Sequence, residues 1–229
     1  MPIFSFTREN IHFGLFFHLK NANFFKKKWF SLLFFVQFMY ILLLERPLLC
    51  AKRIFMISFA EAYKIAAQVH KDQQDKAGGP YIDFLQNVAD YLKNKGESEE
   101  VQTLAILQDL TTGATKKTAE EIVAMGVPAE TVDLIQKMTY HKNQGWIDEY
   151  SCNLMAQGMP AEEATYESRE KDFVRFVETL KDNPLAAKAK SAILNVLLED
   201  KYIHRQERRE LKTQFRLKKY KAAIQALGV

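Results

Sequence analysis

The chain has 229 residues, enough for one helical domain of about 150 to 200 residues and a further segment. Residues 1–55 contain eight Lys or Arg and two Glu, a net charge of +6, whereas the remainder contains 24 basic and 26 acidic residues, a net charge of −2. The remainder therefore gives no electrostatic case for a nucleic-acid partner. Cys50 and Cys152 are too few for a disulfide framework, which favours a reducing, cytoplasmic location.

The leader, residues 1–55, holds twelve of the seventeen Phe and allows three interpretations. Lys26–Lys28 followed by the apolar stretch Trp29–Leu44 resembles a signal or anchor segment, but sixteen helical residues span only about 24 Å of a bilayer core of about 30 Å. Leu48–Cys50 resembles a lipoprotein cleavage box, although Leu rather than a small residue precedes the Cys. In the third interpretation, the working protein begins at Met56. Membrane association is expected only if the leader belongs to the mature protein.

From Met56 onward, apolar residues recur at helical spacing, and the predicted elements are all helices. Three N-termini carry capping signals: Ser58 with Glu61, Thr118 with Glu121, and Asn183 followed by a proline. The expected helices are 59–70, 82–95, 101 to about 111–114, 118–126, 129–139, 147–156, 161–180, 183–198 and a basic amphipathic tail within 202–229 that covers the core; residues 140–146 are expected to form a polar turn. The sequence therefore predicts an all-α bundle with no membrane partner for residues 56–229.

Gln108 and Asp109 end the apolar helical run that contains Val101, Leu104 and Leu107. An aspartate at the edge of an apolar face needs a partner, because burying an unpaired carboxylate costs several kcal/mol or forces its pKa upward. Asp109 is therefore a candidate ligand position.

Three segments, in order, resemble the HD-domain hydrolases of guanosine tetraphosphate (ppGpp), the bacterial-type pyrophosphohydrolases of the stringent response and their small stand-alone relatives. These segments are Ala67–Ile82, with its His-x-x-Gln-x-Asp-Lys-x-Gly-x-Pro-Tyr pattern, Leu104–Asp109, and Asn183–Leu194. The resemblance extends over about residues 56–227. It implies an HD-domain-like helical bundle for this region.

The resemblance also implies a manganese ion held by two His, a His-Asp pair and a later Asp, with a metal-activated water attacking the 3′-diphosphate. His70 and Asp109 match two of these metal ligands. Apolar or amide side chains replace the other three: Phe84, Gln108 and Ile193. Thr112 and Gly113 replace the acidic pair thought to position the water. We therefore expect a chain without a metal cofactor and without catalytic residues.

Each of these residues also has a purely structural interpretation. In that interpretation His70 is a hydrogen-bonded histidine, buried or at the rim of the site, and Asp109 is neutralised by hydrogen bonds from Gln108, a Thr hydroxyl or His70. Phe84 and Ile193 are then apolar plugs in the former metal cavity.

Two classes of function remain open. The first is a non-catalytic binding or regulatory protein, a pseudoenzyme with a guanosine nucleotide ligand or a protein partner. For this first class, the resemblance implies that Lys76 and Tyr81 border the nucleotide pocket and contact phosphate and base. The structural alternative is that Lys76 is a solvated lysine and Tyr81 a core tyrosine. The alternative is an active metal-dependent phosphohydrolase with a rebuilt site, for instance one that uses His141 or His204.

Overall fold

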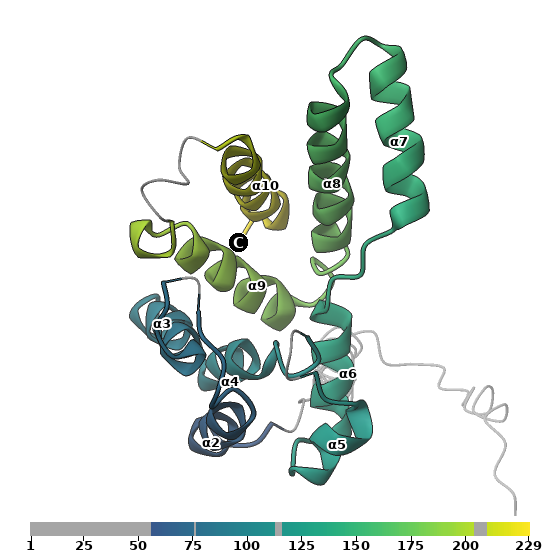
Figure 1. Cartoon of the computed structure of the whole chain (residues 1–229). Helices are drawn as coiled ribbons and strands as arrows, with labels where there is room; N and C mark the ends of the chain where they lie inside the picture. Colours follow the sequence, from purple (N-terminus) through teal and green to yellow (C-terminus); the bar gives the residue numbers. More distant parts are fainter. Residues whose placement is uncertain (1–55, 76, 113–115, 204–209) are drawn as a thin grey trace, which may run out of the picture. The chain divides into compact units, whose positions relative to one another are not determined.

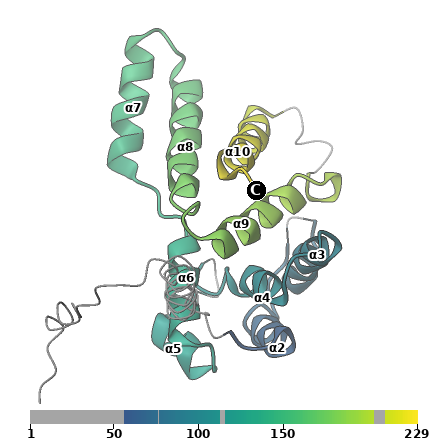
Figure 2. The ribbon, with the colours of Figure 1, turned by 180° about the vertical axis from the view of Figure 1, so that it is seen from behind.

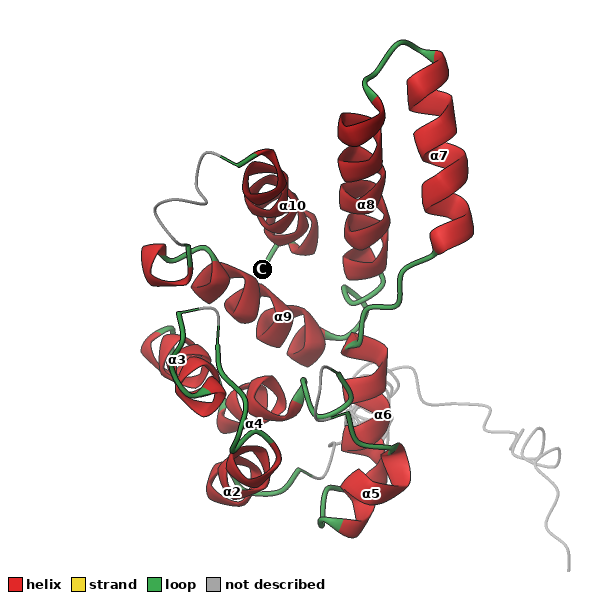
Figure 3. Cartoon of the chain, viewed as in Figure 1, coloured by secondary structure: helices red, strands yellow, loops and turns green. Residues whose placement is uncertain are grey.

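The computed structural model describes residues 56–229 except 76, 113–115 and 204–209. These residues belong to a compact unit that begins at Ile54, and the predictions for the leader lie outside the described residues. Figure 3 shows that the regular elements of the described part are helices, which confirms the predicted all-α fold. They are α2 (Phe59–Val69), α3 (Tyr81–Asn94), α4 (Glu99–Leu107), α5 (Ala119–Ala124), α6 (Ala129–Met138), α7 (Gln144–Ala156), α8 (Ala161–Glu178), α9 (Pro184–Leu197), the short 3₁₀ helix η2 (Asp200–Tyr202) and α10 (Leu211–Leu227).

Helix α9 is the central element of this unit. Figures 1 and 2 show it with α3 and α4 on one side and α10 on the other, and α9 packs against all three. Helices α7 and α8 form an antiparallel hairpin in which α7 packs chiefly on α8, and α8 packs in turn on α10. Residues distant in sequence, from α3, α4 and α10, are thus brought to one helix.

The predicted helix starts are confirmed by their hydrogen bonds. Ser58 with Glu61, and Thr118 with Glu121, form complete capping boxes. Asn183 accepts a hydrogen bond from the N–H of Ala186 at 3.1 Å, and a proline follows it at the first helical position.

Two predicted boundaries are wrong. Helix α4 ends at Leu107, earlier than expected, and the chain continues as a turn in which the Thr112 hydroxyl donates to the backbone carbonyl of Asp109. Such side-chain bonds to the backbone compete with helix continuation. Helix α7 begins at Gln144, inside the predicted polar turn, because Asn143 caps it by accepting from the N–H of Trp146 at 3.1 Å.

The core is formed by α4 and α9 with the apolar faces of their neighbours. Leu104 and Leu107 of α4 and Ala189 of α9 are fully buried. From the tail, Ala223 and Leu227 join the same core, so the expected covering role of the terminal helix is confirmed. Among the described residues, no helix is both long enough and apolar enough to cross a bilayer.

Candidate functional site

A cavity of about 350 Å³ lies where α3, α9 and α10 meet the end of α4. Its volume falls in the range of about 300–1,000 Å³ that is usual for small-molecule sites. Aromatic rings, two lysines and two aspartates line it together with aliphatic side chains. The lining residues are Asp75, Tyr81, Phe84, Gln108, Asp109, Tyr140, Phe173, Lys190, Ile193, Leu194, Leu197, Tyr202, Lys219 and Tyr220.

The loop before α3 places Asp75 and Tyr81 at this cavity. Asp75 Oδ1 accepts hydrogen bonds from the backbone N–H groups of Ala77 at 2.8 Å and Gly79 at 2.9 Å. Gly78 provides the positive φ of 87° that this tight turn requires. The Tyr81 N–H then donates to the backbone carbonyl of Gln73 at 2.8 Å, which fixes the first residue of α3 against the loop.

Tyr81 joins the two residues that the sequence identified as metal-ligand candidates. Its hydroxyl donates to Asp109 Oδ2 at 2.5 Å, and its ring packs against the His70 imidazole with centroids 4.9 Å apart. Burial and the neighbouring Asp109 charge raise the pKa of Tyr81, so the phenol stays protonated and acts as the donor. The Thr112 hydroxyl lies 3.2 Å from the other carboxylate oxygen of Asp109 and shares its proton between that oxygen and the Asp109 backbone carbonyl. Asp109 is thus held by two hydroxyl donors, one of them a threonine.

His70 lies beside the cavity rather than among its lining residues. It is 1% exposed, and its Nδ1 is 2.8 Å from the side-chain oxygen of Gln73. Tyr81 thus contacts the imidazole with its ring and Asp109 Oδ2 with its hydroxyl. The geometry is that of a buried, hydrogen-bonded histidine which supports Tyr81.

Apolar side chains form the wall where the resemblance implies two further ligands. Phe84 is 3% exposed and Ile193 is 4% exposed, and both line the cavity. The Phe84 ring contacts Tyr81 at 5.5 Å and Tyr202 at 5.2 Å between centroids, the second edge-to-face. Neither side chain carries a lone pair for a cation.

Lys190 of α9 lines the cavity beside Gln108. Its Nζ donates to the side-chain oxygen of Gln108 and to the backbone carbonyl of Met138, both at 3.3 Å. Burial lowers the pKa of Lys190, and the charge of Asp109 opposes that effect. The side chain of Gln108 therefore accepts a hydrogen bond from a lysine of α9.

Three cations lie near enough to Lys219 of α10 for their charges to act on its amine. We call these four residues the Lys219 cluster: Lys142, Arg169, Arg216 and Lys219. Burial and then the charges of the other three lower the pKa of Lys219, whereas Glu170 raises it. The charge of Arg169 also acts on Tyr140, and that of Arg216 on Tyr220, both of which line the cavity. The cluster thus adds positive potential at one side of an aromatic cavity.

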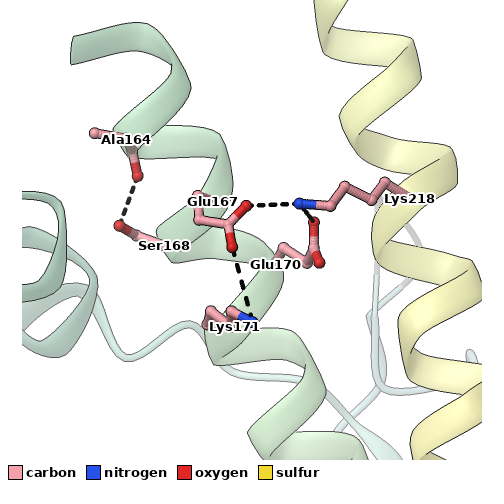
Figure 4. Close-up of polar contacts among 6 residues, drawn as sticks. All are labelled: Ala164, Glu167, Ser168, Glu170, Lys171 and Lys218. Atoms are coloured by element: carbon pink, nitrogen blue, oxygen red, sulfur yellow. Dashed lines mark hydrogen bonds and ion pairs between the residues drawn. The ribbon is translucent and has the colours of Figure 1, made fainter. Parts of the chain in front are cut away.

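Helix α10 is held in position by ion pairs to α8 (Figure 4). Lys218 Nζ lies 2.7 Å from a carboxylate oxygen of Glu167 and 3.2 Å from one of Glu170. Glu167 also pairs with Lys171 at 3.8 Å. Glu170 is buried, at 4% exposed. Because Lys219 directly follows Lys218, these contacts fix the part of α10 that faces the cavity.

Tyr140 connects the cavity to the base of the α7–α8 hairpin. Its hydroxyl donates to Asp172 Oδ2 at 2.5 Å, and the N–H of Asn143 donates to the same oxygen at 3.2 Å. Burial and Asp172 raise the pKa of Tyr140. The Tyr140 ring also packs edge-to-face on Phe173, with centroids 5.0 Å apart.

The cavity thus brings together five residues from the sequence analysis: Tyr81, Phe84, Gln108, Asp109 and Ile193. His70 does not line the cavity but packs against the ring of Tyr81. Lys76 and His204 lie outside the described residues, and His141 is exposed and absent from the cavity lining. Within the described ranges, no group of three His, Cys, Asp or Glu side chains is placed to hold a metal ion.

Sequence reasoning missed Lys190 and Lys219 as site residues. Both sit in helices whose basic residues resemble a solvated face, and only the packing of α9 and α10 turns these two inward. Comparison of the chain with protein-family models and with characterised proteins finds no match.

Proposed function

We propose that this chain is a non-catalytic, HD-like protein that binds a guanosine polyphosphate, or a nucleotide of that class, in the cavity. The observation that carries the proposal is the Lys219 cluster beside a cavity lined by tyrosine and phenylalanine rings. Like charges held close together raise each other's energy, and a polyphosphate relieves this repulsion. The aromatic rings offer faces on which a base can stack.

A carboxylate in the same cavity favours guanine among the bases. Guanine presents an N1–H and an amino group on one edge, and both donate to carboxylate oxygens, whereas the same edge of adenine has an acceptor at N1. An ionised carboxylate has about four lone-pair positions. The hydroxyls of Tyr81 and Thr112 use two positions on Asp109, which leaves acceptor capacity for a base.

The absence of catalysis in this proposal rests on the side chains present at the cavity. Phe84 and Ile193 occupy the wall with carbon atoms alone, and Asp109 is engaged by two hydroxyl donors. Activating water requires a metal with most of its ligand set in place, so that the pKa of the bound water falls toward about 7. The convergence of four mapped positions, 84, 108, 109 and 193, on one cavity supports their descent from an HD-type site.

The proposal is tested by isothermal titration of the full-length protein with guanosine tetraphosphate, guanosine diphosphate, adenosine diphosphate and pyrophosphate. We expect the guanosine polyphosphates to bind most tightly. Lys219→Met should weaken their binding about tenfold or more, because charge-assisted hydrogen bonds contribute roughly 1.5–3 kcal/mol. Lys137→Met is the matched control, since Lys137 is exposed and forms its ion pair with Asp133 on its own helix.

Equal loss of affinity in both lysine variants would contradict the cavity as the binding site. Equal affinity for adenosine and guanosine diphosphates would remove the role of Asp109. Manganese-dependent pyrophosphate release that Asp109→Ala abolishes would favour the alternative, an active phosphohydrolase.

A further inference from the structure

The amine of Lys190 lies at the cavity and, among the described residues, has no hydrogen-bonded carboxylate. The hydrogen bonds of its Nζ go to neutral oxygens, those of Gln108 and of the Met138 backbone, and it appears in none of the ion pairs formed by the described residues. Lys188, one half-turn earlier on α9, differs in this respect, since its Nζ pairs with Glu97 at 2.7 Å. On one helix, the amine of Lys188 is thus paired with a carboxylate, whereas the amine of Lys190 is hydrogen-bonded to neutral oxygens.

Burial favours the neutral form of an amine and lowers the pKa of Lys190, and the charge of Asp109 opposes this effect only in part. An ordinary lysine, with a pKa of about 10.4, is only about 0.1% neutral at about pH 7.4. The neutral amine is the nucleophile, so a lysine held in an apolar pocket reacts with carbonyl groups far more readily than a solvated one.

The cavity provides the remaining parts of a carbonyl site. It has room for a small ring, its walls include Phe84 and Ile193, and a second lysine, Lys219, lines it from α10. A compound with an aldehyde and a phosphate group can therefore place the aldehyde at Lys190 and the phosphate at the Lys219 cluster.

We propose that Lys190 forms an imine with small aldehydes that carry a phosphate group, with Lys219 binding the phosphate. The amine nitrogen attacks the carbonyl carbon, the carbonyl electron pair moves to the oxygen, and a proton passes from the nitrogen to that oxygen. The resulting carbinolamine then loses its hydroxyl as water while the nitrogen gives up a proton, and a C=N bond forms. One water is released, and the step needs neither oxidant nor reductant.

The step is independent of the nucleotide proposal, although both use the same cavity. A nucleotide that binds there should shield Lys190 from the aldehyde. Failure of imine formation alongside tight nucleotide binding would overturn only the carbonyl site, and the reverse result would overturn only the nucleotide proposal.

The test treats the full-length protein with pyridoxal 5′-phosphate, reduces it with borohydride and quantifies modified lysines by peptide mass spectrometry. We expect modification of Lys190 to exceed that of Lys188 and Lys137 at least about tenfold, the factor that one pH unit makes in amine deprotonation. Parallel samples contain pyridoxal without the phosphate. Lys219→Met should lower labelling of Lys190 by pyridoxal 5′-phosphate but leave its labelling by pyridoxal unchanged.

Labelling spread evenly over the surface lysines would overturn the proposal, as would an unmodified Lys190. Equal labelling of Lys190 by the two probes would overturn the role of Lys219. A Lys190→Arg variant keeps a cation at the position and supplies a second check: circular dichroism must report the wild-type fold, and the dominant labelled peptide must disappear. Persistence of that labelling pattern in the folded variant would also contradict the assignment.

Discussion

Replacement of Phe84 by alanine tests whether an apolar plug stabilises the cavity wall. Phe84 is 3% exposed and packs against the rings of Tyr81 and Tyr202. Truncation of a buried phenylalanine to alanine costs about 3–5 kcal/mol, through lost burial and the void left behind. For a domain of this size each kcal/mol lowers the melting temperature by about 2–4 °C, so Phe84→Ala should lower it by roughly 6–20 °C.

Differential scanning calorimetry measures this change, and Phe84→Leu serves as the matched variant. Leucine keeps an aliphatic plug but removes two ring contacts, each contributing about 0.5–1.5 kcal/mol, so its loss should be about 1–3 kcal/mol. A Phe84→Ala protein that melts within about 2 °C of wild type would refute the packing argument.

Three further predictions concern the metal, the α8–α10 contact and Lys190. A chelator should leave the melting temperature unchanged within about 2 °C, since loss of a structural ion removes several kcal/mol; a large drop would contradict the metal-free fold. Glu170→Gln should lower the free energy of unfolding by about 1–2 kcal/mol in urea titrations, a partial loss because Lys218 is half exposed; an effect no larger than that of Lys137→Gln would count against it. The pKa of Lys190 is lowered in the folded state, so the unfolded chain binds more protons between that lowered pKa and about pH 10.4. The unfolding free energy of wild type relative to Lys190→Met should therefore rise from about pH 8 to about pH 10, and a flat or falling difference would contradict the burial of this amine.

The presence of each helix could be predicted from the sequence, as could the start of those with recognisable capping residues, because local signals determine them. Capping residues such as Ser58 and Asn183 satisfy N–H groups of their own helix, and these predictions are confirmed. Boundaries were less predictable where side chains compete with the backbone. Thr112 bonds to the carbonyl of Asp109 and ends the helical run early, and Asn143 starts α7 inside a stretch whose composition suggests a turn.

The candidate site was predictable only in its parts that carry a motif. Tyr81 and Asp109 belong to segments that resemble a known family, and a direct hydrogen bond joins them. Lys219 carries no such signal, because its inward position depends on how α10 packs on α8 and α9. Long-range pairs such as Lys218 with Glu170, or Lys190 with Gln108, accompany that packing, and helical periodicity in a single segment contains no information about them.

The central claim is that the cavity holds a guanosine polyphosphate without hydrolysing it. Equilibrium dialysis of the full-length protein with guanosine tetraphosphate and manganese, followed by chromatography of both compartments, tests binding and turnover in one measurement. The account predicts that intact guanosine tetraphosphate accumulates on the protein side and that Lys219→Met reduces this excess. Equal nucleotide concentrations in the two compartments, or conversion to guanosine diphosphate and pyrophosphate, would contradict it.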